Sequence, residues 1–190
     1  MATKPSNSVL WLVQLALLTA IVVVLQMLSA FIKFGPFQIT LALVPIAIGA
    51  AVLGVWEGGW LGFVFGLVVL LNGDAAPFLA FHAPGTILTV LLKGMGAGLA
   101  AGIVYKMLSK KNKTAAAIAS SIAAPIVNTG IFILGCFIFF IPLLTEWAGG
   151  ENVTSFLLLT VIGLNFVVEF ATVVILSGVI VRIINIWKKA

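Results

Sequence analysis

Six long apolar segments, separated by short polar or glycine- and proline-rich stretches, cover most of the chain. Their approximate bounds are 9–31, 37–54, 57–72, 85–108, 114–144 and 155–187. Because a helix that crosses a bilayer needs about 20 apolar residues, the pattern predicts an all-α integral membrane protein with a bundle of six transmembrane helices. The second and third segments are short and adjacent, which predicts short or tilted helices joined by a tight turn. No polar block is long enough to fold separately, so we expect residues 1–190 to form one domain.

Small residues recur at every fourth position in three of these segments. The sets are Gly58, Gly62 and Gly66, then Gly94, Gly98 and Gly102, and a shorter pair of Ala16 and Ala20 in the first segment. Small residues at this spacing allow helix backbones to approach closely within lipid. The two glycine sets therefore predict helix packing inside the bundle, and the alanine pair predicts a face available to a partner protein.

Composition agrees with a membrane protein and indicates how it is oriented. Hydrophobic residues make up 63% of the chain and charged residues only 8%, whereas soluble domains carry about 25% charged residues. The net charge is +5, and the basic residues gather between Lys106 and Lys113 and near both ends of the chain. This distribution is typical of cytoplasmic loops. It predicts that both termini are cytoplasmic and that the charge faces the lipid bilayer rather than nucleic acid.

Three of the expected helices carry a polar stripe, and two of the stripes include a charge. The stripes are Thr86, Thr89 and Lys93, then Ser121, Asn128 and Phe132, and finally Asn165, Glu169 and Thr172. A charge at membrane depth normally faces the protein interior or a water-filled cavity and marks a functional site. At a rise of about 1.5 Å per residue, Lys93 lies roughly 12 Å below Gly85. The stripes predict a pocket for a small polar solute; the alternative is a Lys93–Glu169 ion pair that only holds the bundle together.

Aromatic and proline-rich loops are predicted on the outward side, over residues 32–38 and 73–85, with a third loop over 145–154. Phe37, Phe78 and Phe81 are candidates to close over a ligand; the alternative is an aromatic belt at the membrane interface. Gln38, Phe81 and His82 are candidate ligand contacts, although a loop histidine is also explained by a local hydrogen bond.

The chain lacks the motifs of several enzyme classes. It has no phosphate-binding loop, no His-Glu-x-x-His pair and a single cysteine, Cys136. These absences argue against ATP hydrolysis by this chain, a catalytic metal or another cofactor. The prediction is a binding protein without enzymatic activity. A membrane-embedded enzyme acting on lipid, and a small channel or structural protein, are the alternative classes.

The order of these features resembles the substrate-binding S-components of energy-coupling factor (ECF) vitamin transporters. The resemblance rests on six helices in about 190 residues, the Ala16-x-x-x-Ala20 motif, the stretch from Phe34 to Pro45 leading into the second helix, and the stretch from Pro125 to Phe132. It implies a vitamin site near the outer face of a bacterial plasma membrane. It also implies docking, through Ala16 and Ala20, on a transmembrane scaffold (T) subunit that works with two cytoplasmic ATPase subunits.

The vitamin is inferred from the chemistry of the stripes. Lys93 suits a carboxylate, and Asn128, Asn165 and the threonines suit hydroxyls and amides. Pantothenate offers one carboxylate, one amide and two hydroxyls, and the sequence is most similar to the pantothenate-type branch of the family. Glu169 would then pair with Lys93, accept a hydroxyl proton or be protonated. Cobalamin, pyridoxine-type compounds and riboflavin are the alternatives.

Overall fold

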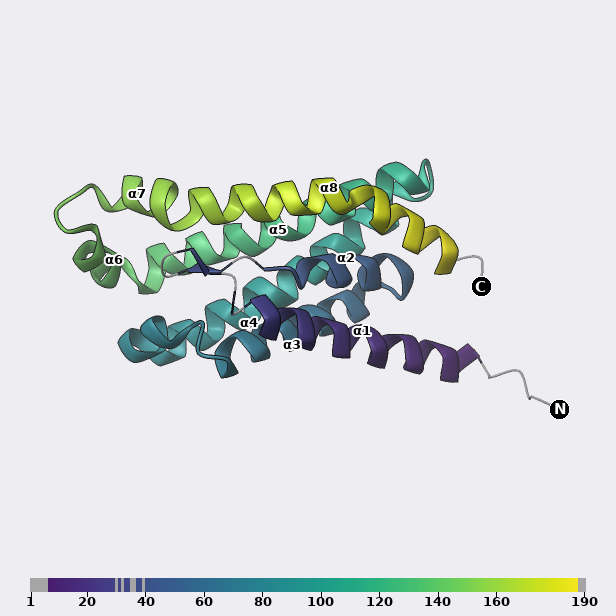
Figure 1. Cartoon of the computed structure of the whole chain (residues 1–190), viewed down its shortest axis with the longest axis horizontal. Coiled ribbons are helices and arrows are strands. Elements are labelled where there is room, and N and C mark those ends of the chain that lie inside the picture. The colour runs from purple at the N-terminus through teal and green to yellow at the C-terminus, as the bar shows by residue number, and fades with distance from the viewer. Residues whose placement is uncertain (1–6, 30, 32, 35–36, 39, 188–190) are drawn as a thin grey trace.

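The computed structural model describes residues 7–187 apart from 30, 32, 35–36 and 39, and it consists mainly of helices (Figure 1). In chain order the elements are α1 (Asn7–Ser29), β1 (Lys33–Phe34), β2 (Phe37–Gln38), α2 (Leu43–Val52), α3 (Val55–Leu71), α4 (Ala76–Leu108), α5 (Lys113–Phe139), α6 (Ile141–Ala148), α7 (Val153–Phe156), a π-helical stretch (Leu157–Gly163) and α8 (Leu164–Trp187).

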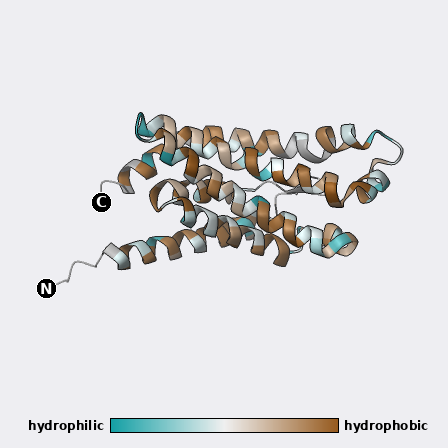
Figure 2. Ribbon diagram, turned by 180° about the vertical axis from the view of Figure 1, so that it is seen from behind, coloured by the Kyte–Doolittle hydropathy of each residue, from teal (hydrophilic) through white to brown (hydrophobic). Residues whose placement is uncertain are grey.

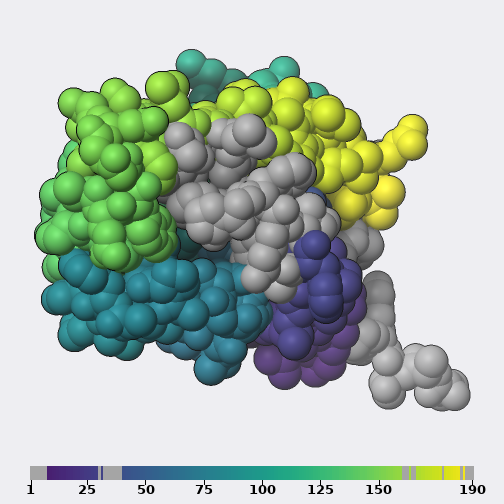
Figure 3. All heavy atoms as spheres, turned by 60° about the vertical axis from the view of Figure 1, so that its left-hand side comes forward, coloured from purple at the N-terminus to yellow at the C-terminus, as the bar shows by residue number. Residues whose placement is uncertain are grey.

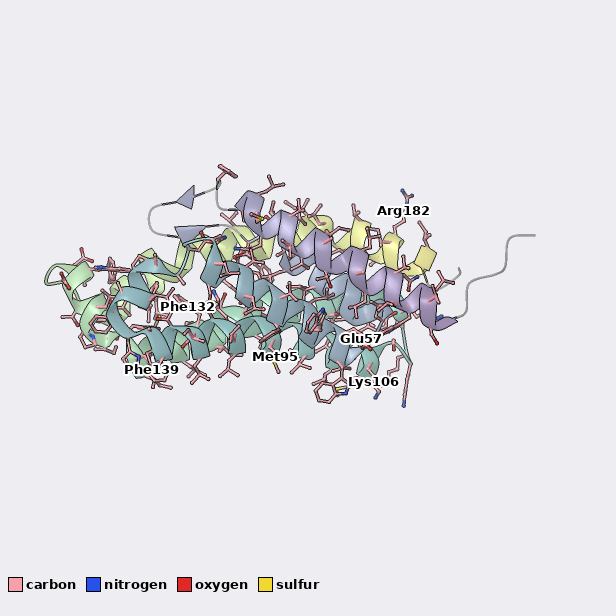
Figure 4. The ribbon with its side chains drawn as sticks, turned by 90° about the horizontal axis from the view of Figure 1, so that it is seen from below. Glu57, Met95, Lys106, Phe132, Phe139 and Arg182 are labelled. Carbon is pink, nitrogen blue, oxygen red and sulfur yellow. The ribbon has the colours of Figure 1, made fainter. Side chains whose placement is uncertain are left out.

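The helices form an elongated bundle in which α4 packs against α3 and α5, and α5 packs against α8. The start of α1 and the end of α8 lie at one end of this bundle, and α6 and α7 lie at the other (Figure 1). Lys106 and Arg182 lie towards the end at which α1 begins (Figure 4). Lys106 and Arg182 therefore share one end with the start of α1 and the end of α8, as the charge pattern predicts, while the side of the membrane that this end faces stays a prediction.

Length and apolar composition identify three membrane-spanning candidates among the described residues: Ser8–Ser29, Ala76–Leu108 and Lys113–Phe139. A fourth is added if the pair Phe166–Leu176 and Gly178–Ile184, bent by 52°, counts as one span. Apolar residues run along the lengths of the helices (Figure 2). The helical membrane architecture is confirmed. The predicted count of six spans stays a prediction, because α2 and α3 are shorter than a straight span, as their sequences indicate.

The predicted loop over residues 73–85 is wrong in its extent, because helix α4 already begins at Ala76. Pro77 occupies the first turn of α4, where the missing N–H is not needed for a helical hydrogen bond. The helix is instead interrupted at His82, whose φ of −149° and ψ of 82° are not helical. Pro84 explains the position of this break, because a proline inside a helix clashes with the preceding turn.

The fifth and sixth apolar segments are also divided more finely than predicted. Helix α5 ends at Phe139, and the following residue, Phe140, has a φ of −120°. Helix α6 then begins with Pro142 in its first turn. As a result, most of the predicted loop over 145–154 is helical. Residues 157–163 form a π-helical stretch before α8, so the last segment is not one regular helix. Over residues 32–38, the described part is the antiparallel pair of β1 and β2, with Phe34 opposite Phe37.

The glycines of α3 and α4 face one another along the contact between these helices, which confirms the packing predicted for them. A Cβ atom on Gly62 would overlap the backbone carbonyl of Gly94, and a Cβ on Gly98 would overlap the carbonyl of Gly58. A Cβ on Gly66 would lie only 2.9 Å from the carbonyl oxygen of Val90. The absence of side chains at these positions allows α3 to pack closely against α4, the helix that carries Lys93.

Replacing Gly94 by alanine is expected to lower the stability of the bundle. The added methyl group would overlap the carbonyl of Gly62 and approach the ring of Phe65 to 2.9 Å, and overpacking of this kind typically costs about 1–3 kcal/mol. Thermal unfolding in detergent measures the effect. Gly130→Ala is the matched control, because its Cβ would meet nothing within 4 Å and alanine is the better helix former. Equal midpoints for the two variants would contradict the packing argument.

Candidate functional site

The polar stripe of α4 begins at the break in this helix. The imidazole Nδ1 of His82 accepts a hydrogen bond of 3.0 Å from the Gly85 amide, and the ring stacks on Phe139 at 5.5 Å between centroids. The Thr86 hydroxyl donates to the His82 carbonyl at 3.0 Å. These contacts assign His82 a local role at the start of the main part of α4, and its predicted contact with a ligand stays a prediction. Thr86 and Thr89 are both buried.

Lys93 lies where α3, α4 and α5 meet. Its ammonium nitrogen is 5.1 Å from the ring centroid of Phe132 on α5 and 5.9 Å from that of Phe65 on α3. Aromatic faces attract a cation but leave its N–H groups without an acceptor. Within the described residues, no hydrogen bond or ion pair is recorded for Lys93. The ammonium is therefore a candidate donor to an anionic ligand.

Glu169 on α8 is a buried charge, with 1% of its surface exposed. Its Oε1 atom accepts a hydrogen bond of 3.1 Å from the backbone amide of Thr40, which precedes α2. Lys93 is within electrostatic range of Glu169 and of Asp74. The charged stripes of α4 and α8 are thus directed to one interior region, and the sequence did not indicate the part taken by Thr40.

The third stripe places Asn128 in the same interior. Asn128 is buried on α5, one turn before Phe132. Among the described residues, nothing donates a hydrogen bond to its Oδ1 atom. A buried carbonyl oxygen without a donor is unfavourable, so this atom is suited to a hydroxyl or N–H of a ligand. Asn165 and Gln38 lie in α8 and β2, and their side chains fall outside the described part of the structure.

An aromatic cluster covers the Lys93 region on the side of α6 and α7. Phe78, in the first turns of α4, makes edge-to-face contacts with Phe132, Phe140 and Trp147 at centroid distances of 5.8, 4.9 and 5.5 Å. Figure 3 turns this end of the molecule towards the viewer and shows α6 and α7 lying directly above the start of α4. Phe132 and Phe139 lie in this half of the bundle (Figure 4). Phe78 therefore packs on the same ring that contacts Lys93.

The other two residues predicted to close over a ligand behave differently. Phe81 is 43% exposed, so it points away from the aromatic cluster that buries Phe78. Phe37 is paired through its backbone with Phe34, while its side chain is outside the described part. The closure of these segments over a ligand stays a prediction, for which Phe78 is the best-placed residue.

Two polar residues that the sequence interpretation did not assign to the site lie next to it. Gln26 on α1 is completely buried, and its Nε2 atom donates a hydrogen bond of 3.2 Å to Asp74 Oδ2. Asp74 lies in the turn between α3 and α4 and is within electrostatic range of Lys93. The available signal was Gln26 itself, a glutamine near the end of an otherwise apolar helix.

Together these groups suit a small molecule with both an anionic group and hydrogen-bond donors. Lys93 supplies a cation, Asn128 supplies an acceptor, and Glu169 supplies a carboxylate that is held by a backbone amide. A ligand of this kind replaces hydrogen bonds to water with bonds to the protein, and the surrounding low dielectric strengthens them.

Comparison with known proteins gives two findings. A sequence model of the family described as "ECF transporter, substrate-specific component" matches residues 11–185. The chain is also 28% identical over 184 residues to the pantothenic acid transporter PanT of Lactococcus lactis subsp. cremoris (strain MG1363). This alignment covers 88% of the chain and 89% of the relative.

Proposed function

Because the chain belongs to the family of ECF transporter substrate-specific components, we propose that it binds pantothenate at the outer side of a bacterial plasma membrane and delivers it inward. The family and the similar protein are transporters rather than enzymes, and the apolar helices make the chain a multi-pass membrane protein. The similarity to a pantothenic acid transporter supports the choice of vitamin.

The observation that carries this proposal is the position of Lys93. Its ammonium stands against two aromatic rings, and no acceptor is recorded for it within the described residues. A charge-assisted bond to a carboxylate is roughly twice as strong as a neutral hydrogen bond. The carboxylate of pantothenate is an acceptor of this kind. The hydroxyl groups and the amide N–H of pantothenate can donate a hydrogen bond to the Asn128 Oδ1 atom.

Glu169 is compatible with an anionic ligand because groups of the protein stabilise its carboxylate. The Thr40 amide bonds its Oε1 atom at 3.1 Å, and Lys93 offsets its charge from within electrostatic range. The carboxylate can then accept a hydrogen bond from a ligand hydroxyl without requiring contact with the ligand carboxylate.

The direct test is binding by the purified protein. Mass spectrometry of small molecules released on unfolding, followed by equilibrium titration, is expected to identify pantothenate as the ligand. Parallel titrations with riboflavin, cobalamin and pyridoxine serve as controls. Tight binding of one of these vitamins, with no binding of pantothenate, would overturn the assignment of the substrate.

The same proposal includes partners for transport. We expect the chain to work with a transmembrane T subunit and two cytoplasmic ATPase subunits, as its family does. Ala16 and Ala20 are exposed on α1, and they lie on a different side of this helix from Leu18 and Val22, which are buried against the bundle. This arrangement leaves the two alanines available to another transmembrane helix.

Replacing Phe78 by leucine is expected to speed dissociation of the vitamin several-fold while changing the association rate less. Leucine removes the edge-to-face contacts that hold the start of α4 on Phe132, and such contacts contribute about 0.5–1.5 kcal/mol each. Stopped-flow dissociation with excess competing ligand measures the effect. Phe81→Leu is the control, because Phe81 is 43% exposed. Equal dissociation rates for the two variants would argue against a role for Phe78 in retaining the ligand.

A further inference from the structure

Near its C-terminal end, α1 carries a buried amide side chain, that of Gln26. The amide nitrogen is hydrogen-bonded, and the amide oxygen has no partner among the described residues. Gln26 has 0% of its surface exposed. Its Nε2 atom donates to Asp74 Oδ2 at 3.2 Å, and none of the described residues donates to its Oε1 atom. The orientation of the amide follows from this bond, in which Nε2 donates and the carboxylate oxygen accepts. Oε1 is therefore turned away from Asp74.

The inward face of α1 changes character at this point. Leu18 and Val22 are buried and apolar, and they belong to the central hydrophobic cluster. The next residues on the same face, Gln26 and Ser29, are buried and polar. Ser29 is fully used: its hydroxyl donates to the Leu25 carbonyl at 2.8 Å and accepts from the Leu41 amide at 3.2 Å. Hydrogen bonds within the described structure thus satisfy the Ser29 hydroxyl and the Gln26 Nε2 atom but leave the Gln26 Oε1 atom without a donor.

Contacts connect Gln26 to the candidate binding site. Asp74, which holds the Gln26 amide, directly precedes Ala75, and Ala75 belongs to the same buried apolar cluster as Phe65, whose ring centroid lies 5.9 Å from the Lys93 ammonium. The Asp74 backbone amide donates to Asn72 Oδ1 at 3.1 Å, and Asn72 Nδ2 is buried without an acceptor among the residues that the structure describes. Among the described residues, Gln26 Oε1 is thus an unused acceptor and Asn72 Nδ2 an unused donor on either side of Asp74.

We propose that Gln26 contacts the transported vitamin, with its Oε1 atom accepting a hydrogen bond from a ligand hydroxyl or amide N–H, and that Asp74 positions the Gln26 amide for this contact. The inference rests on the proposed function, because the ligand is the vitamin that the family component carries. It extends the site beyond α4, α5 and α8 to α1. Lys93 binds the anionic end of the ligand, and Gln26 and Asn128 accept from its neutral end.

Gln26→Leu tests the contact while preserving an apolar shape of similar size. We expect the dissociation constant for pantothenate to rise about tenfold or more, because a donor of the ligand is left buried without an acceptor. Thermal unfolding of the ligand-free variant measures the structural cost separately, because the substitution removes the unsatisfied oxygen but also the hydrogen bond from Nε2 to Asp74. Gln14→Leu, at a half-buried position on the same helix, should change neither quantity.

A ligand cycle distinguishes direct contact from an indirect effect. Pantothenate has three hydrogen-bond donors, namely two hydroxyl groups and one amide N–H. Pantothenate and three analogues, each lacking one of these donor hydrogens, are titrated against the natural protein and against Gln26→Leu. Direct contact predicts that one analogue loses affinity for the natural protein but loses no further affinity for the variant. Additive losses for all three analogues, or an unchanged pantothenate affinity with a lower unfolding temperature, would overturn the proposal.

Failure of the proposed substrate gives a different result. If the natural protein does not bind pantothenate, the assignment of the vitamin is wrong, and the same Gln26→Leu and Gln14→Leu titrations are carried out with whichever of riboflavin, cobalamin or pyridoxine binds. Gln26→Asn, which keeps an amide but shortens it, is the second variant in every series. Intermediate affinity for Gln26→Asn supports the contact, and affinity equal to that of the natural protein for both Gln26 variants overturns it.

Discussion

Replacing Lys93 by alanine is expected to weaken pantothenate binding by about 10- to 100-fold or more. The expectation follows from the loss of a charge-assisted hydrogen bond, which is worth about 1.5–3 kcal/mol, where each 1.4 kcal/mol is tenfold in affinity. The ammonium lies against the Phe132 and Phe65 rings, so nothing else described in the bundle depends on it as a hydrogen-bond donor. Equilibrium titration of the purified variant measures the loss.

Two further variants make the Lys93 result interpretable. Lys93→Met keeps the length of the side chain and its packing on the rings but removes the charge, so it should bind as weakly as Lys93→Ala while avoiding the cavity that alanine leaves. Lys106→Ala removes a lysine from the exposed end of the same helix and should bind normally. Unchanged affinity in Lys93→Met would remove the Lys93 charge from the binding site.

Much of the bundle could be predicted from local patterns. Apolar length identified the helical segments, and glycine at every fourth position identified two helix faces that pack inside the bundle, because a helix repeats its faces at nearly this interval. That these two faces pack on each other came from the structure. The predicted loops were less accurate. Pro77 begins a helix rather than excluding one, since proline is tolerated in a first turn, and composition alone does not distinguish a first turn from a loop.

The candidate site was predictable only where the residues share a helix. Thr86, Thr89 and Lys93 are related by spacing, and the structure buries both threonines. The Thr40 amide that bonds Glu169 and the Asp74 carboxylate that bonds Gln26 come from other elements. Contacts of this type depend on how helices are arranged in space, so periodicity within one segment gives no indication of them.

Helix α1 has two faces with separate expected roles. Its inward face ends in the buried Gln26 beside Asp74, and its outward face carries the exposed alanines at positions 16 and 20. Because the alanines are exposed and Gln26 is buried, substitutions on the outward face should affect docking on a partner without changing the binding site. This separation of binding from docking is the basis of the following prediction.

Replacing both Ala16 and Ala20 by leucine is expected to abolish vitamin uptake while leaving pantothenate affinity of the isolated protein unchanged. Leucine side chains keep the helix apolar, but they prevent the close backbone approach that small residues allow between transmembrane helices.

Uptake by cells, and co-purification with the T and ATPase subunits, measure the effect of the double substitution. Ile21→Phe adds similar bulk at an exposed position of α1, roughly 100° around the helix from Ala20. Cells with this variant should take up the vitamin at the natural rate. A double variant that co-purifies with its ATPase subunits and transports the vitamin at the natural rate would show that docking uses another face. Loss of transport in the Ile21→Phe control as well would show that the whole outward surface of α1, rather than the alanine pair, contacts the partner.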